Sequence, residues 1–251
     1  RADHFRYITG FIFPKFTSKN SIAYLEYTKR ISEKYNEVLY AMPILESEAI
    51  VYKETRIQEL INIKQIVDDY SDIILNIRVG GTDFSSKFGL RRSIDSSIYN
   101  VRVVSDCLID IINMFSRDGE DYVISAPVWE YFSEDIKSKE VSGLINEIKS
   151  DKENGFCGKT IIHPSQIKYV NSLYTVTYEE YIDAKSIISS LEDGGVFKGY
   201  GGNKMNEVKP HFNWAKKVMN RAEIFGVLNE GISYEELYKE SNFSSKSIEV
   251  L

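Results

Sequence analysis

The chain has 251 residues, of which 43% are hydrophobic and 27% charged, and its formal net charge is −6. This composition is ordinary for a globular protein, and the length fits one large α/β domain or two small ones. The acidic balance, the lack of a dense Lys/Arg cluster and the absence of a long apolar run argue against nucleic acid and membranes as partners.

The cellular compartment is predicted from the cysteines and the start of the chain. Cys107 and Cys157 lie far apart in apolar surroundings, which indicates buried thiols and not a disulfide or a metal pair. The first ten residues do not have the pattern of a signal peptide. We therefore expect a cytoplasmic protein.

Apolar runs alternate with helical periodicity along the first 163 residues. We expect strands at residues 7–15, 38–45, 73–79, 121–128 and 156–163, and helices between them at residues 18–34, 48–69, 97–115 and 138–154. Strict alternation predicts parallel strands joined by crossover helices. Five such units fit an open doubly wound sheet, and they are three short of an eight-stranded barrel.

The alternation stops after Pro164, and the rest of the chain is predicted to be helical. We expect helices at residues 164–170, 177–191 and 208–225, and a short helix followed by a Ser-rich polar segment within residues 233–251. Thr177 and Glu180 have the spacing of a capping box. The predicted division is a sheet domain over residues 1–175 and a helical extension over residues 176–251.

The third strand ends in a pattern that is typical of a ligand site. Gly80 and Gly81 follow the apolar run, and Asp83 comes two residues after Gly81. Glycine allows a tight turn and a close approach of backbone N–H groups to a ligand, and ligands of α/β folds gather at the carboxyl ends of strands. A solvated carboxylate after a core strand, with glycines that serve only the turn, is the alternative interpretation.

Four segments together resemble one known family. They are IFPK at residues 12–15, PILES at 43–47, RVGGTDF at 78–84 and GFCGKTIIHPSQIKYVN at 155–171. In this order they resemble the citrate lyase β-subunit-like family of aldolases and lyases. The segment RVGGTDFSSKFGLRR resembles a divergent TIM-barrel C–C bond lyase branch of this family more closely than citrate lyase itself. This branch is linked to stress-response operons.

The resemblance implies a (β/α)8 TIM barrel followed by C-terminal helices. The five strands expected here would be the fourth to eighth of that barrel. The first three, with an acidic strand end and an Arg-x-Asn strand end that binds substrate, have no counterpart in the chain. Lys159 is expected on the last strand, paired in the barrel interior. A homo-oligomer is also expected.

The resemblance also implies a Mg²⁺ site. Glu46 and Asp83 would follow neighbouring strands about 4.8 Å apart, so that both carboxylates could bind one ion, with Glu48 as a rival to Glu46. Lys15, at the end of the first strand, would join them as a catalytic residue that binds a carboxylate or phosphate. The residues expected to contact substrate are Gly80, Gly81, Thr82, Pro127 and His163.

The implied activity is a lyase or aldolase reaction on a 2-oxo acid or a hydroxy-acyl substrate, free or as a coenzyme A thioester. The Mg²⁺ ion would stabilise an enolate as a C–C bond breaks or forms. A non-catalytic barrel that binds a ligand or partner proteins of a stress-response biosynthetic operon is one alternative. An open-sheet α/β enzyme that uses no metal is another. Binding of Mg²⁺ and the distance between the two carboxylates separate these hypotheses.

Overall fold

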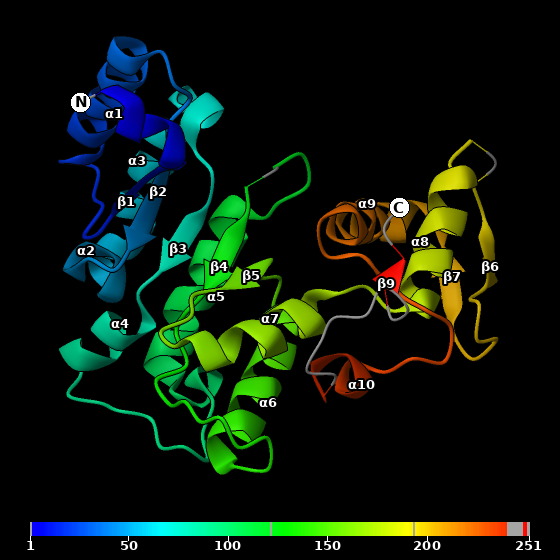
Figure 1. The fold of residues 1–251 in the computed structure, drawn as a ribbon. Helices are drawn as coiled ribbons and strands as arrows, with labels where there is room; N and C mark the ends of the chain where they lie inside the picture. Colours follow the sequence, from blue (N-terminus) through cyan, green and yellow to red (C-terminus); the bar gives the residue numbers. More distant parts are fainter. Residues whose placement is uncertain (1, 121, 193, 240–247, 250–251) are drawn as a thin grey trace. The chain divides into compact units, whose positions relative to one another are not determined.

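The computed structural model describes residues 2–120, 122–192, 194–239 and 248–249 (Figure 1). The chain divides into two compact units, Arg1–Pro164 and Ser165–Leu251. Each unit has its own elements and its own core. The domain division after residue 175 stays a prediction.

The first unit is built on one sheet of parallel strands. They are β1 (Gly10–Phe13), β2 (Tyr40–Leu45), β3 (Ile77–Val79), β4 (Ile124–Ala126) and β5 (Gly158–Lys159). Each strand lies beside the next one in the sequence, in the order β1-β2-β3-β4-β5. A doubly wound sheet reverses its order at a switch point, so that the sequential order excludes this alternative for the described strands. Within the described residues this parallel sheet does not close into a barrel.

Several strands are shorter than the apolar runs that predicted them. The run at 73–79 begins with a 3-10 turn at Ser71–Ile73, its strand is Ile77–Val79, and Ile74 pairs with Ala41 in an isolated parallel bridge. The last run contributes Gly158–Lys159, so that His163 lies beyond the strand instead of ending it. Apolar residues can fill a core without joining a ladder, which explains the difference. Asp121, the expected start of the fourth strand, lies outside the described residues.

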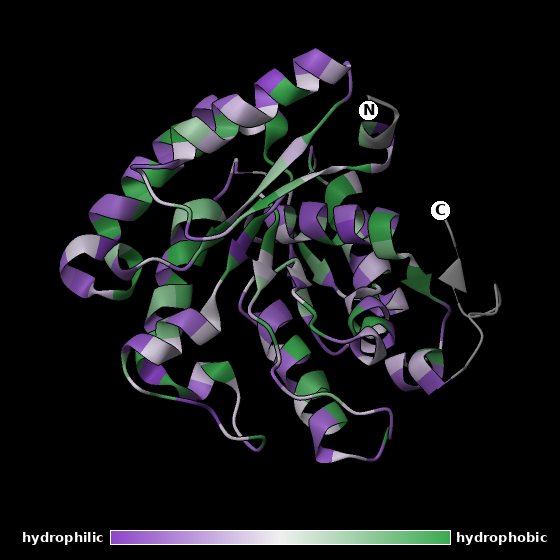
Figure 2. Cartoon of the chain, turned by 60° about the vertical axis from the view of Figure 1, so that its left-hand side comes forward, coloured by the Kyte–Doolittle hydropathy of each residue, from purple (hydrophilic) through white to green (hydrophobic). Residues whose placement is uncertain are grey.

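Helices follow the strands of this unit, as the alternation predicted. They are α1 (Ser21–Tyr35), α2 (Glu48–Val51), α3 (Lys53–Asp69), α4 (Gly81–Lys87), α5 (Arg102–Phe115) and α6 (Lys139–Glu153). Figure 2 shows hydrophobic and hydrophilic segments along them, as expected for helices with one buried side.

Three helix predictions need correction. The helix expected at 48–69 divides at Tyr52, whose backbone is extended with φ −86° and ψ 131°. The helix expected at 97–115 divides at Val101 into a 3-10 turn and α5. The first helix begins after Asn20 and not at Ser18, because the amide and hydroxyl of Ser18 both donate to Glu59, at 2.8 and 2.7 Å.

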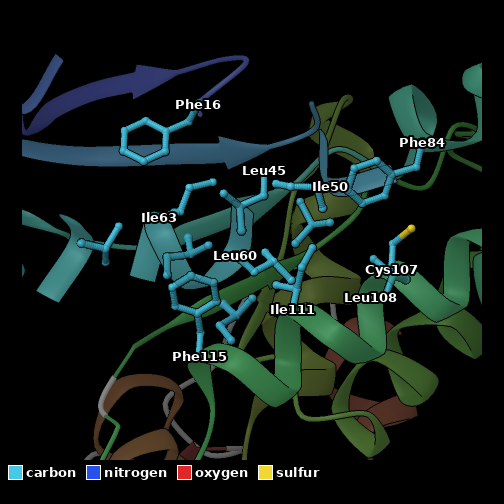
Figure 3. Packing of buried hydrophobic residues seen from close by; sticks show 14 of the residues in the cluster. Phe16, Leu45, Ile50, Leu60, Ile63, Phe84, Cys107, Leu108, Ile111 and Phe115 are labelled. Atoms are coloured by element: carbon cyan, nitrogen blue, oxygen red, sulfur yellow. The ribbon is translucent and has the colours of Figure 1, made fainter. Parts of the chain in front are cut away.

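The core of this unit lies between the sheet and its helices (Figure 3). Leu45 of β2 packs with Leu60 and Ile63 of α3 and with Ile111 and Phe115 of α5. Each of these side chains is fully buried. The strands that carry the candidate site are therefore held on a packed layer.

The second unit contains two helices that pack on each other. Its elements are α7 (Ile167–Tyr174), α8 (Tyr178–Ser189), α9 (Val208–Phe225), α10 (Tyr234–Lys239), the hairpin of β6 (Val196–Lys198) and β7 (Met205–Glu207), and the pair β8 (Val227–Leu228) and β9 (Ile248–Glu249). The capping box at Thr177 and Glu180 is confirmed, with a Glu180 amide to Thr177 hydroxyl distance of 3.2 Å. The expected Ser-rich segment falls largely outside the described residues.

Among the described residues, none of the helices combines the length and the apolar character that crossing a bilayer requires.

Candidate functional site

The candidate site lies at the carboxyl ends of β1, β2 and β3. Glu46 follows β2 directly, and Gly80 follows β3 directly. The two strand ends are joined by a hydrogen bond of 3.1 Å from the Gly80 amide to the Leu45 carbonyl. Because the strands are parallel, their carboxyl ends meet at one edge of the sheet, as the sequence predicted.

Lys15, Glu46 and Asp83 are in mutual contact at this edge. The Lys15 amide donates to Oε1 of Glu46 at 2.9 Å, and the Lys15 ammonium lies 3.7 Å from the same oxygen. The ammonium also donates to Oδ1 of Asp83. One cationic nitrogen therefore contacts both carboxylates.

The backbone of Lys15 has an uncommon conformation. Its φ of 54° lies in the left-handed region, which costs a non-glycine residue about 1–2 kcal/mol. In this conformation both the amide and the ammonium of Lys15 contact the Glu46 carboxylate. The local strain is thus coupled to the position of the Glu46 carboxylate.

Asp83 lies on a helix, where the sequence predicted a loop. Gly80 is the N-cap of α4, and Asp83 is in its first turn. Thr82 is exposed, and its hydroxyl lies 3.4 Å from a carboxylate oxygen of Glu130. A contact of Gly80, Gly81 and Thr82 with substrate stays a prediction.

The two glycines are required by close packing as well as by the turn. A Cβ at Gly80 would lie 2.5 Å from Oε2 of Glu46, and a Cβ at Gly81 would lie 2.8 Å from Cβ of Pro127. Real Cβ atoms do not approach so closely. The glycine pair therefore lets β3 and α4 lie against Glu46 on one side and Pro127 on the other.

The protonation of Glu46 is set by opposing effects. Its side chain is buried, and burial raises the pKa of the carboxyl, whereas the hydrogen bond from the Lys15 amide lowers it and the neighbouring Asp83 raises it. The net direction is upward. The pKa of Lys15 is also raised, chiefly by its hydrogen bond to Asp83. An excess of negative charge at this edge favours a bound cation.

Sequence reasoning missed the polar side chains on the face of the sheet away from the core. On β3 and just before it, Asn76 and Arg78 alternate with Ile77 and Val79, which are buried in the core. Nε of Arg78 donates to the Thr160 hydroxyl at 3.3 Å. The signal was available, because two polar residues at a spacing of two inside an apolar run indicate one polar face of a strand.

The remaining predicted residues lie in different surroundings. Pro127 is buried beside Gly81. The ring of His163 stacks on Phe132, with centroids 4.2 Å apart. Glu48, the rival to Glu46, pairs with Lys87 at 2.6 Å. No group of three or more Asp, Glu, His or Cys side chains suited to a metal occurs among the described residues, so that the candidate centre contains two carboxylates.

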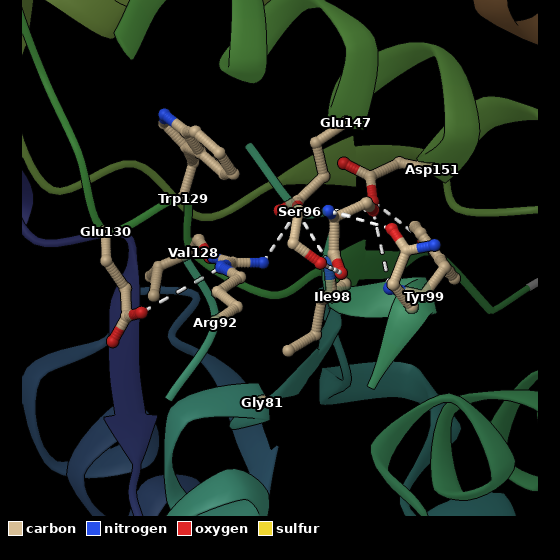
Figure 4. A network of polar contacts seen from close by, with 12 residues as sticks. Gly81, Arg92, Ser96, Ile98, Tyr99, Val128, Trp129, Glu130, Glu147 and Asp151 are labelled. Atoms are coloured by element: carbon tan, nitrogen blue, oxygen red, sulfur yellow. Dashed lines mark hydrogen bonds and ion pairs between the residues drawn. The ribbon is translucent and has the colours of Figure 1, made fainter. Parts of the chain in front are cut away.

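A buried charged network lies behind the site (Figure 4). The Lys159 ammonium donates to Glu147 at 3.0 Å and to Asp151 at 2.8 Å, and Arg92 donates to Glu147 at 2.6 Å. The predicted pairing of Lys159 is confirmed, but its partners are on α6 and not in a barrel interior. Glu147 also accepts from the amide of Ile98, which lies against Gly81.

Comparison with known proteins agrees with the fold. A family model described as C–C bond lyase of the TIM-barrel fold matches residues 1–227. The citrate lyase subunit beta of Escherichia coli (strain K12) is 30% identical over 92 residues, which cover 36% of this chain and 30% of that protein. This chain therefore matches less than a third of the length of that relative.

Two solved structures share the fold. A citrate lyase from Burkholderia xenovorans LB400 superposes with a TM-score of 0.63 at 14% identity, over 86% of this chain and 64% of that one. CitE from Mycobacterium tuberculosis, in complex with magnesium, acetoacetate and coenzyme A, superposes with a TM-score of 0.52 at 20% identity, over 85% and 68%. At these identities the likeness supports the fold alone.

Proposed function

Because the chain belongs to the C–C bond lyases of the TIM-barrel fold, we propose that it acts as a Mg²⁺-dependent lyase or aldolase with Glu46 and Asp83 as the metal ligands. The observation that supports this proposal best is the contact of one ammonium group with both carboxylates. A cation that contacts both carboxylates occupies the place that a shared metal ion would take.

The two carboxylates fit Mg²⁺ in their chemistry. Mg²⁺ prefers oxygen ligands, and it is commonly held by one or two carboxylates while it keeps several waters. When bound, the ion would supply a Lewis acid for a carbonyl oxygen. The Lys15 amide would hold Glu46 in place, and Gly80 leaves the room that the Glu46 side chain occupies.

The Lys15 ammonium has two possible partners in this proposal. Its side chain is 59% exposed, so that it can leave the carboxylates when a metal ion binds them. It would then face a substrate carboxylate at the same edge of the sheet. A Schiff base is not required for this role.

The substrate of the proposed reaction is a 2-oxo acid or a hydroxy-acyl compound, free or as a coenzyme A thioester. The ligands named for the mycobacterial relative, acetoacetate and coenzyme A, support this class. The proposal also includes a cytoplasmic location and a homo-oligomer. Light scattering of the full-length protein can test the oligomeric state.

The contact with Lys15 favours a second candidate function as well. An internal ammonium contacts both carboxylates and balances one of their two charges, as it would in a protein that needs no metal. Such a protein would be a non-catalytic barrel that binds a ligand or a partner. The two candidates differ in one measurable property, which is the response to Mg²⁺.

Thermal unfolding of the full-length protein with and without Mg²⁺ tests the metal site. We expect Mg²⁺ to raise the unfolding midpoint of the wild type and to leave the midpoints of Glu46→Gln and Asp83→Asn unchanged. Glu48→Gln is the matched control, because Glu48 is a nearby exposed acid that pairs with Lys87. A wild type without any Mg²⁺ response would contradict the metal site and favour the non-catalytic function.

A further inference from the structure

Arg78 differs from the other arginines that the fold holds inside. It lies in the middle of β3, on the face of the sheet opposite the core, because its neighbours Ile77 and Val79 point into the core. It comes two residues before Gly80, the residue that packs on Glu46. Arg78 therefore lies directly below the candidate site on the same face.

The guanidinium of Arg78 forms no ion pair among the described residues, although the charge on Glu46 acts on it. Within the described part of the chain, its side chain makes one hydrogen bond, the 3.3 Å contact from Nε to the Thr160 hydroxyl. Arg56 and Arg92, by contrast, reach the carboxylates of Asp110 and Glu147 at 2.7 and 2.6 Å. Ion pairs within the fold therefore explain why Arg56 and Arg92 are buried, but they do not explain the position of the two terminal nitrogens of Arg78.

This arrangement is costly unless a ligand uses it. Arg78 is half-buried, and burial lowers the pKa of its guanidinium, against a weaker opposing effect of the charge on Glu46. An arginine whose two terminal nitrogens have no partner in the described part of the chain indicates a place where a ligand with acceptor oxygens completes the contacts.

We propose that Arg78 binds a carboxylate group of the substrate through its two terminal nitrogens. The guanidinium presents a planar fork of donors that matches a carboxylate, and a half-buried position strengthens this pairing. The inference rests on the proposed function, because it places the substrate between Arg78 and the Glu46–Asp83 pair. Arg78 would then select substrates whose carboxylate lies farther from the Glu46–Asp83 pair than the carbonyl that reacts.

The test measures binding of two probes of nearly equal shape to the full-length protein, by calorimetric titration. Acetoacetate carries a carboxylate, and acetoacetamide carries a neutral amide in its place. We expect the wild type to bind acetoacetate at least about tenfold more tightly than acetoacetamide, because a hydrogen bond between two charged groups is stronger than one to a neutral amide. Equal binding of the two probes, or no binding of acetoacetate, would overturn the proposal.

Variants assign this preference to Arg78. Arg78→Gln should bind both probes equally weakly, and Arg78→Lys, which keeps the charge but lacks the fork, should bind acetoacetate several-fold more weakly than the wild type. Arg102→Gln is the matched control, since Arg102 is exposed at the start of α5 and has no partner among the described residues. Wild-type affinity for acetoacetate in either Arg78 variant would overturn the proposal.

The Mg²⁺ response of the same variants separates this inference from the metal site. Arg78→Gln should keep the rise of the unfolding midpoint with Mg²⁺, because Glu46 and Asp83 are intact. Loss of acetoacetate binding with a retained Mg²⁺ response supports both proposals. Acetoacetate binding that depends on Arg78 in a protein without any Mg²⁺ response would support Arg78 and contradict the metal site alone.

Discussion

A methyl group on Gly80 would lie 2.5 Å from both Cβ and Oε2 of Glu46. The first residue after β3 and the first residue after β2 therefore share one small space, and only a residue without a side chain leaves it to the carboxylate. We expect Gly80→Ala to displace Glu46 from the Lys15 amide. The variant should fold but lose the Mg²⁺-dependent rise in its unfolding midpoint.

Gly158→Ala is the matched control for this prediction. A Cβ at Gly158 would meet the Ser125 hydroxyl oxygen at 3.4 Å, which is an ordinary contact, and the position lies on β5, two strands away from β3 in the same sheet. This variant should keep the wild-type response to Mg²⁺. An unchanged response in Gly80→Ala as well would show that Glu46 is not displaced.

The family resemblance implied the three charged residues of the site, and parallel strands explain why they meet, because such strands place their carboxyl ends together. Lys15 ends one expected strand, Glu46 and Asp83 come after two others, and the structure brings the three into contact. The helix that carries Asp83 was missed, because a glycine pair after a strand is typical of a loop. Arg78 was missed because it lies inside an apolar run.

The buried side of α3 shows a second limit of sequence reasoning. Ile57, Leu60, Ile61 and Val67 recur at helical spacing, which predicts that they share the buried side, but Ile57 is 49% exposed. The side that is buried contains Arg56, Leu60, Ile63 and Val67. A hydropathy pattern cannot place an arginine in a core, because the acids that compensate it lie on α5, distant in the sequence.

The pKa of Glu46 leads to a prediction on stability. The carboxyl has a raised pKa in the fold, mainly through burial, so that the folded state binds this proton more tightly than the unfolded chain. Its contribution to stability is present at low pH and is lost as the pH rises through the raised pKa. We therefore expect Glu46→Gln, without Mg²⁺, to gain stability relative to the wild type between acidic and neutral pH.

Urea unfolding across this pH range measures the effect. The glutamine oxygen can still accept from the Lys15 amide, so that the hydrogen bond is not lost. The Glu48→Gln variant, at an exposed acid nearby, shows how much of the difference any Glu→Gln substitution produces. A difference between Glu46→Gln and the wild type that shrinks toward neutral pH would contradict the raised pKa.

Arg56 offers a test of how α2, α3 and α5 are held together. Its Nε and Nη2 donate to the carbonyls of Ile50 and Val51, both at 2.8 Å, and its Nη1 donates to Asp110 at 2.7 Å. A lysine has one nitrogen and cannot satisfy the three acceptors in this geometry. We expect Arg56→Lys to lose about 1–3 kcal/mol of unfolding free energy for each acceptor that stays buried and unpaired.

Chemical denaturation measures this loss, with Arg102→Lys as the control. Arg102 is exposed, and the same substitution there should change the unfolding free energy by less than about 0.5 kcal/mol. If Arg56→Lys is as stable as the control, the three hydrogen bonds do not hold the helices.

Lys159 provides the last prediction, because its ammonium is fully buried between Glu147 and Asp151. Lys159→Met leaves Asp151 without its cation, and removal of one partner of a buried pair costs about 3–5 kcal/mol. Burial raises the pKa of Asp151, whereas the charge on Lys159 lowers it, so that the substitution raises the pKa further. Asp151 then takes up a proton on folding, and the loss of stability should be smaller at pH 5 than at pH 7.5.

Urea unfolding at both pH values tests this prediction. The control is Lys139→Met, which removes an exposed pair with Asp95 and should cost less than about 1 kcal/mol at either pH. A loss that is equal at both pH values would show that Asp151 stays charged without Lys159.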